Sequence, residues 1–313
     1  LLLTMTYEAK VNMSDAFTSV KYWDVLIYNH LLRQKIVIPT KPRSESKGEK
    51  YVGAYVKDPQ VGQHKWVMSF DLNSLYPHLI MQYNISPEML LPQTMPYNDN
   101  TIDEMLSKQI DLSMLPAAQV ARTPNGALFR TKKQGFLPKM MQEMYNDRTI
   151  YKKKMLIAQQ QYEDTKDPKY LNDVSRYQNI QMARKISLNS AYGAIGNEWF
   201  RYYDLKIAEG ITTSGQLSIR WIEKALNGYL NKLLKSKEVD YVIASDTDSV
   251  YIRFDELVNK VLTKRDAESE DSYRLRVVDF LDKIAQEKIE PFIDKSYQDL
   301  AKYVNAYEQK MEM

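Results

Sequence analysis

Cysteine is absent from this 313-residue sequence, which excludes a disulfide framework and thiolate metal sites and fits a reducing compartment. Histidine is scarce: His30, His64 and His78 lie far apart along the chain, so a zinc site is not expected. The sequence has no run of about eighteen apolar residues, so no transmembrane helix is expected. The first residues also lack the features of a secretory leader.

The composition is that of an ordinary globular protein, with 44% hydrophobic and 27% charged residues. The length suffices for a large core and favours two sub-domains. The formal net charge of +3 conceals an uneven distribution. Residues 130–206 carry 15 Lys and Arg against 8 Asp and Glu, whereas residues 254–313 carry 10 against 14. We therefore expect the middle of the chain to face phosphate groups.

Hydrophobic periodicity predicts several long helices and a few strands. The predicted helices cover residues 14–36, 138–163, 168–191 and 209–235, with one or two more between 272 and 304. A buried strand is expected at 65–72, a β-hairpin at 241–252 and a loop at 39–50; residues 91–136 have no clear pattern. A short polar break between the second and third helices indicates an antiparallel helical hairpin. The fold class is predicted as α+β, a mixed or antiparallel sheet with packed helices and a helical-hairpin sub-domain.

Two aspartates, Asp246 and Asp248, lie at the tip of the expected β-hairpin, in "YVIASDTDSVYI". An aspartate in a tight turn often serves only to bond its own backbone. However, the apolar flanking strands would carry this pair towards the interior, where carboxylates need cations. Asp71, at the end of the strand expected at 65–72, offers a third carboxylate. Together they are suited to Mg²⁺ and phosphoryl transfer, with unequal roles for the two hairpin aspartates because a turn splays its side chains.

Two groups of polar residues share helix faces. Lys185, Asn189 and Tyr192 are spaced at i, i+4 and i+7 and precede Gly193, so one face could hold a triphosphate and a base. Arg148 and Lys152 are spaced at i and i+4 on the preceding helix, at the start of "KKK". The alternative for both groups is a solvated helix face. Two basic faces on one hairpin favour a binding function.

Three ordered motifs resemble motifs A, B and C of family B DNA polymerases: "DLNSLYP" at 71–77, "KISLNSAYGAIGN" at 185–197 and "SDTDS" at 245–249. "YNDRTIYK" at 145–152 is similar to the fingers segment of that family, and "YVGAYVKDP" at 51–59 to the segment between the exonuclease and polymerase regions. "SLYPHLIMQYNISPEML" and "GNEWFRYYD" are most similar to replicative polymerases of T-even-type tailed phages. Ala244 and Ser245 stand where the family usually has Tyr-Gly.

The resemblance implies a role for each motif residue. Asp71 and Asp248 would bind two Mg²⁺ ions, for which Mn²⁺ may substitute, with the Leu72 carbonyl as a further ligand and Asp246 as an auxiliary carboxylate. The remaining residues would bind the incoming nucleotide. They are the Ser74 and Leu75 amides, Tyr76 as a steric gate against ribose, Arg148, Lys152 and Lys185 on the phosphates, Asn189 assisting them, and Tyr192 and Gly193 beside the nascent base pair.

The implied organisation is a palm and fingers. Residues 1–50 would lead into the palm after an exonuclease domain, 51–135 and 196–313 would form the palm, 136–195 the fingers, and the thumb would be missing. We expect such a fragment or split-gene core to add dNTPs to the primer 3′-OH of primer-template DNA during viral replication, in the cytoplasm of an infected bacterium. Partners would be replisome proteins and a separate exonuclease or thumb polypeptide, with no membrane contact. Exposed apolar surfaces facing those missing domains are expected at Trp23 and Trp199.

Two other functions stay open from the sequence. The chain could be a catalytically incomplete DNA-binding subunit that needs a partner polypeptide. It could also be a different enzyme on a similar sheet, such as a two-metal nuclease or a nucleotidyl cyclase. Tyr76 and the Lys185, Asn189, Tyr192 face argue against the latter, because a nuclease has no incoming sugar to inspect.

Overall fold

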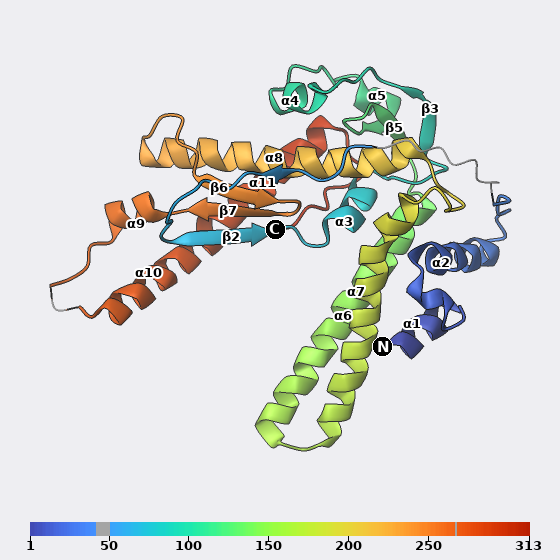
Figure 1. The fold of residues 1–313 in the computed structure, drawn as a ribbon, viewed down its shortest axis with the longest axis horizontal. Helices are drawn as coiled ribbons and strands as arrows, with labels where there is room; N and C mark the ends of the chain where they lie inside the picture. The colour runs from blue at the N-terminus through green and yellow to red at the C-terminus, as the bar shows by residue number, and fades with distance from the viewer. Residues whose placement is uncertain (42–50, 267) are drawn as a thin grey trace.

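The structure is a computed structural model that describes residues 1–41, 51–266 and 268–313. Its centre is a four-stranded antiparallel sheet in the order β1-β6-β7-β2 (Figure 1). The strands are β1 (Val56–Lys57), β6 (Val242–Asp246), β7 (Ser249–Arg253) and β2 (Val67–Asp71). Helices pack on this sheet and a helical hairpin extends from it, so the predicted α+β class is confirmed.

The central strands form where the sequence predicts them because their apolar residues face packed helices. In β7, Val250 and Ile252 are fully buried whereas Tyr251 between them is exposed, which is the alternation of a strand with one covered face. Helix α8 (Leu205–Leu234) covers this face and packs on both β6 and β7. It begins four residues earlier than predicted, where the Asp204 side chain accepts a hydrogen bond from the Lys206 amide.

The helical hairpin consists of α6 (Phe136–Thr165) and α7 (Lys169–Ile195). Both predicted helices are confirmed, and the turn between them contains Lys166 in the left-handed conformation. The hairpin projects away from the sheet and is joined to it at its base (Figure 1). There α6 and α7 both contact α3 (Leu75–Gln82), the short helix that follows β2.

A second, three-stranded sheet occupies the region in which the sequence shows no clear pattern. Its strands are β3 (Leu90–Thr94), β5 (Ala127–Arg130) and β4 (Val120–Arg122), accompanied by α4 (Thr101–Leu106) and α5 (Leu115–Ala118). The turn between β4 and β5 contains Gly126 at φ +76°, where an added Cβ would lie 2.2 Å from the Met95 carbonyl oxygen. Only glycine fits this turn.

The N-terminal region and the region after β7 are mainly helical. α9 (Asp255–Val261) and α10 (Glu270–Ile284) follow β7, and a π-helical turn leads from α10 into α11 (Glu290–Tyr303). α1 (Leu2–Ala9) and α2 (Ser19–Arg33) lie beside α7 (Figure 1). Of the predicted loop at 39–50, residues 42–50 lie outside the described residues. Among the described helices, none has the length and apolar character needed to cross a bilayer.

One expectation about the surface is wrong. Trp199 is 55% exposed, as predicted, but Trp23 is only 1% exposed. The Trp23 side chain is buried because α2 packs against α7, a contact between segments more than 160 residues apart in sequence. Sequence periodicity places Trp23 on the apolar face of its helix but cannot show what covers that face.

Candidate active site

Asp71 and Asp246 end neighbouring strands of the central sheet. Both residues are register partners of Ser249, Asp71 across β2 and β7 and Asp246 across β6 and β7. Asp248 occupies the two-residue turn between β6 and β7, and its carbonyl oxygen accepts the Leu72 amide at 2.7 Å. The end of β2 is therefore tied directly to the turn that carries Asp248. The sheet brings the three predicted aspartates to one edge.

The turn itself has a constrained backbone. Thr247 has φ 53°, and its amide donates to the Tyr55 carbonyl at 3.0 Å. The Asp248 amide donates to the Asp246 carbonyl at 2.5 Å, which closes a tight turn. The two hairpin aspartates differ in burial: Asp246 is an exposed strand residue whereas Asp248 is half-buried in the turn.

The electrostatics of this edge favour a bound cation. Burial raises the pKa of Asp248, and the neighbouring carboxylates of Asp71 and Asp246 raise it further. Within the described ranges, no Lys or Arg forms an ion pair with any of the three. As arranged, no group of three or more His, Cys, Asp or Glu side chains among those residues could hold a metal ion. A cation bound beside Asp248 would lower the repulsion from the neighbouring carboxylates.

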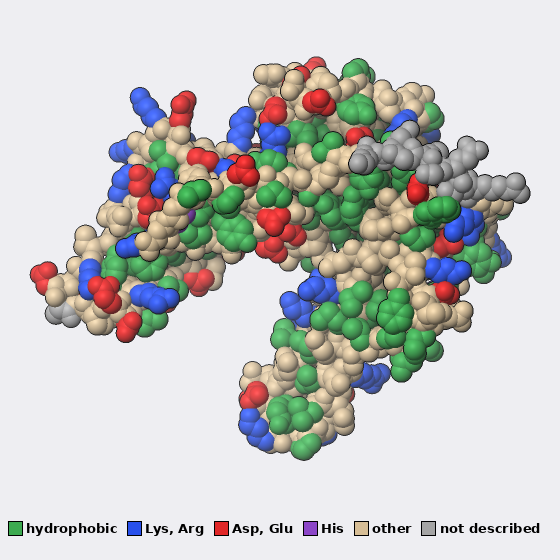
Figure 2. All heavy atoms as spheres, viewed as in Figure 1, with side chains coloured by type: hydrophobic (Ala, Val, Ile, Leu, Met, Phe, Trp, Pro, Cys, Tyr) green, Lys and Arg blue, Asp and Glu red, His purple; other side chains and the backbone are tan. Residues whose placement is uncertain are grey.

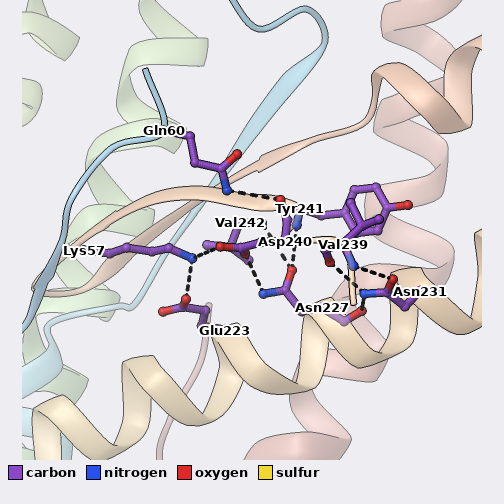
Figure 3. Close-up of polar contacts among 9 residues, drawn as sticks. All are labelled: Lys57, Gln60, Glu223, Asn227, Asn231, Val239, Asp240, Tyr241 and Val242. Carbon is purple, nitrogen blue, oxygen red and sulfur yellow. Dashed lines mark hydrogen bonds and ion pairs between the residues drawn. The ribbon is translucent and has the colours of Figure 1, made fainter. Parts of the chain in front are cut away.

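A polar network at the start of β6 fixes β1 and β6 on α8 (Figure 3). The Lys57 ammonium lies 2.5 Å from a Glu223 oxygen and 2.7 Å from an Asp240 oxygen. Burial lowers the pKa of Lys57, but the hydrogen bonds to Asp240 and Glu223 outweigh this and leave it raised. Asn227 donates to Asp240 at 2.8 Å and accepts the Tyr241 amide at 2.8 Å. Sequence reasoning missed this network, because no local pattern joins residues 57, 223 and 240.

Ser74 lies between Asp71 and the first turn of α3. It occupies the N-cap position of α3, where its φ is 49° and its side chain makes no capping hydrogen bond. Its Oγ instead accepts a hydrogen bond from Arg148 Nη1 of α6 at 3.3 Å. Arg148 is thereby brought from the helical hairpin to the end of β2. The Arg148 Nε is buried and has no hydrogen-bond partner among the described residues.

The rings of Tyr76 in α3 and Tyr192 in α7 are in contact where these two helices meet. Their ring centroids are 4.5 Å apart, and the Tyr192 hydroxyl donates to the Tyr51 hydroxyl at 3.1 Å. Burial raises the pKa of Tyr76, with a further contribution from the Asp248 carboxylate, so Tyr76 lies within electrostatic range of the aspartates. Tyr76 also borders Gly215 of α8, where an added Cβ would lie 3.6 Å from the ring. Sequence reasoning did not single out Tyr51 or Gly215.

The remaining predicted residues differ in burial. Lys152, Lys185, Asn189 and Gly193 are exposed, whereas Leu75 and Leu72 are buried at the base of the site. Figure 2 shows a hollow with acidic side chains at the end of the sheet and Lys or Arg side chains across from them on the flank of the hairpin. Opposite charges thus face each other across open space, which suits a ligand with both a cation and phosphates.

The fold is similar to that of a solved DNA polymerase. The family B DNA polymerase from the hyperthermophilic archaeon Pyrobaculum calidifontis matches with a TM-score of 0.55 over 92% of this chain and 30% of that chain. The sequences are 22% identical, so this match establishes the fold.

Sequence comparison identifies the family. The model of DNA polymerase family B matches residues 18–267. The DNA-directed DNA polymerase of Escherichia phage RB69 is 35% identical over an alignment of 350 residues, gaps included, that covers 97% of this chain. That of Enterobacteria phage T4 is 32% identical over 354 residues, which cover 100% of this chain. The chain therefore belongs to DNA polymerase family B, and its predicted similarity to T-even-type phage enzymes is confirmed. It spans 37% and 38% of the lengths of these two relatives.

Proposed function

We propose that this chain is the nucleotide-adding core of a phage DNA polymerase, which extends a primer 3′-OH with dNTPs under the direction of a template. The observation that carries the proposal is the cluster of Asp71, Asp246 and Asp248 at the sheet edge. Burial and the neighbouring carboxylates of Asp71 and Asp246 raise the pKa of Asp248. Figure 2 shows acidic side chains at the end of the sheet, across a hollow from basic side chains on the hairpin. In this family, such an arrangement supports two-metal phosphoryl transfer.

The proposed reaction is an in-line displacement at the α-phosphorus of the dNTP. The primer 3′ oxygen forms the new bond to phosphorus, the bond to the β-phosphate oxygen breaks, pyrophosphate leaves, and the 3′-hydroxyl proton passes to solvent. Two Mg²⁺ ions, or Mn²⁺ in their place, would supply Lewis-acid stabilisation of the oxygens involved. Asp71, Asp248 and the Leu72 carbonyl would hold these ions, and Asp246 would add negative charge beside them.

The nucleotide would be held between the sheet and the helical hairpin. The Ser74 and Leu75 amides at the start of α3 would donate to the triphosphate. Arg148 is already beside Ser74, and Lys152 and Lys185 would follow as the hairpin closes. The phosphate oxygens would also meet the Asn189 amide. Tyr76 would pack beneath the sugar and exclude a 2′-hydroxyl, with Tyr192 and Gly193 next to the base pair.

The chain then divides into a palm of 51–135 and 196–313, fingers of 136–195, and a leading segment of 1–50. Proposed partners are primer-template DNA, dNTPs and replisome proteins, with an exonuclease and a thumb on other polypeptide segments. The phage relatives support a role in the cytoplasm of an infected bacterium.

Primer extension by the purified chain with Mg²⁺, beside the near-isosteric variant Asp71→Asn, tests the proposal. We expect nucleotide addition by the chain and none by the variant. Addition that survives in Asp71→Asn contradicts the assignment of the aspartates. A chain that binds primer-template and Mg²⁺·dNTP but adds no nucleotide supports instead the alternative of a binding subunit that needs a partner polypeptide.

A further inference from the structure

Helix α2 is hydrogen-bonded to one turn of α7 through two buried aromatic residues. The Trp23 Nε1 donates to the Ser187 carbonyl at 3.2 Å and to the Ser190 Oγ at 3.1 Å. The Tyr22 hydroxyl lies 2.7 Å from the Ser187 Oγ. Tyr22 and Trp23 are each 1% exposed, and Ser187 is fully buried. These bonds connect helices that are more than 160 residues apart in the sequence.

The donors and acceptors in this contact are fully matched. The Ser187 Oγ gives its one proton to the Ala183 carbonyl at 2.9 Å, so the Tyr22 hydroxyl must be the donor to Ser187. Likewise, the Ser190 Oγ donates to the Ser187 carbonyl at 2.9 Å and accepts from Trp23. Burial raises the pKa of Tyr22, which keeps its hydroxyl protonated as this network requires. A buried, satisfied network of this kind fixes a single relative position of two helices.

The contact lies directly behind the candidate phosphate-binding face. At about 100° per residue, Ser187 and Ser190 point to the side of α7 opposite Lys185 and Asn189. The burial agrees with this geometry, because Ser187 is buried whereas Lys185 and Asn189 are exposed. One turn of α7 therefore carries the proposed phosphate-binding side chains on its exposed face and the contact with α2 on the opposite face.

Ion pairs of Arg184 connect the same part of α7 to α1 and α6. Arg184, next to Lys185, lies 3.0 Å from a Glu8 oxygen of α1 and 3.1 Å from an Asp147 oxygen of α6. The Arg184 and Glu8 side chains are 19% and 16% exposed. The N-terminal helices thus hold α7 from two directions at the level of Lys185.

We infer that Tyr22 and Trp23 are positioning residues for nucleotide binding: through Ser187 and Ser190 they set the position of Lys185 and Asn189. This inference rests on the proposed function, since it assigns the mechanical support of the proposed phosphate-binding face. Neither aromatic side chain touches the hollow itself, so their effect on nucleotide binding must pass through α7.

The primary test is Trp23→Phe, which deletes the Nε1 donor and keeps an aromatic ring in the site. Trp221→Phe is a matched control, because Trp221 is 8% exposed and its Nε1 donates to the Ser296 carbonyl at 3.0 Å and Oγ at 3.1 Å, away from the hairpin. Affinity for Mg²⁺·dNTP is measured by titration of the chain on primer-template with a dideoxy-terminated primer. We expect about fivefold weaker nucleotide binding in Trp23→Phe and less than about twofold change in the control, at similar losses of thermal stability.

Tyr22→Phe provides a second variant that removes a single oxygen atom, so folding is not at risk. Its control is Tyr297→Phe, a fully buried tyrosine whose hydroxyl donates to the Ser218 carbonyl at 3.4 Å. Equal losses of nucleotide affinity in test and control variants would overturn the inference, because they would report general destabilisation. Unchanged affinity in both Trp23→Phe and Tyr22→Phe would overturn it as well.

A double-mutant cycle separates this inference from the proposed function. If Trp23 acts through Lys185, Trp23→Phe should weaken nucleotide binding much less in a Lys185→Ala background than in the native chain. The same fold-change in both backgrounds contradicts the inference while leaving Lys185 in its proposed role. If Lys185→Ala alone leaves nucleotide affinity unchanged, the role of Lys185 in the proposed function fails first, and the positioning role falls with it.

Discussion

The acidic hairpin β6–β7 and the basic hairpin α6–α7 face the same hollow but are held in different ways. β6 has backbone partners on both sides, β1 and β7, and the Lys57 network fixes it to α8. α6 and α7 contact other elements at their base, and towards the tip they pack mainly on each other. One of the ion pairs at the tip, Lys166 with Glu163, joins side chains that are each 65% exposed.

This difference matches what each hairpin has to do in the proposed reaction. Carboxylates that share metal ions must keep fixed separations, so they belong on a sheet whose strands cannot shift independently. Cations that bind a triphosphate must let the nucleotide in and then enclose it, which suits a hairpin held only at one end. Contacts of α1 and α2 with α7 fix the position of the end at which the basic hairpin is held.

The largest expected effect comes from Asp248→Asn, which keeps the shape of the acidic hairpin but removes one charge. Nucleotide addition should fall by about three orders of magnitude, because a charge that stabilises the transition state is lost. Without metal, the variant should unfold at a higher temperature than the native chain, since burial and the Asp71 carboxylate disfavour ionised Asp248. Mg²⁺ should stabilise the native chain more than the variant in thermal unfolding. A lower unfolding temperature for the metal-free variant would contradict the like-charge account.

A smaller effect is expected from Tyr76→Ala, at the contact between α3 and α7. Removing the ring opens space beneath the sugar, so incorporation of rNTP relative to dNTP should rise by about tenfold or more. Single-nucleotide incorporation with both substrates measures this ratio. Tyr192→Phe is the control, because it keeps the stacked ring and removes only the hydroxyl bonded to Tyr51. Unchanged sugar discrimination in Tyr76→Ala would remove its role as a steric gate.

The smallest expected effects compare ion pairs in the two hairpins directly. Lys57→Met breaks a partly buried network at the start of β6 and should lower the free energy of unfolding by about 2 kcal/mol. Lys166→Met breaks an exposed pair at the tip of the basic hairpin and should leave the unfolding midpoint unchanged. Urea unfolding of both variants tests the contrast. Equal losses of unfolding free energy in the two variants would mean that the ion pair at the tip of the basic hairpin stabilises the chain as much as the network at β6 does.

The sequence predicts the parts of this molecule whose patterns are long and local. The periodicity of α6, α7 and α8 and the apolar strands around Asp246 and Asp248 are strong enough to place those elements. The sheet of β3, β4 and β5 was not predicted, because its strands are short and β3 contains Pro92. The Asn125-Gly126 dipeptide at its turn was the one local signal available there.

Contacts between distant segments account for the remaining errors and omissions. Trp23 was expected at the surface because nothing near it in sequence indicates that Ser187 and Ser190 cover it. Tyr51, Gly215 and the Lys57 network were missed for the same reason. The motifs identify which side chains carry chemistry, but the neighbours that position them come from other parts of the chain.

The central claim is that the acidic hairpin stays fixed while the basic hairpin moves over bound nucleotide. Because the sequence contains no cysteine, spin labels can be attached at two introduced cysteines alone. We would label the exposed positions Gln160 on α6 and Lys232 on α8, with Lys65 and Lys232 as a control pair within the sheet region. Distances between the labels would be measured by double electron–electron resonance on the chain bound to primer-template. Addition of Mg²⁺ and the complementary dNTP should shorten the mean distance between positions 160 and 232 and narrow its distribution, and should leave the control pair unchanged. An unchanged distance between Gln160 and Lys232, with nucleotide bound, would contradict the account.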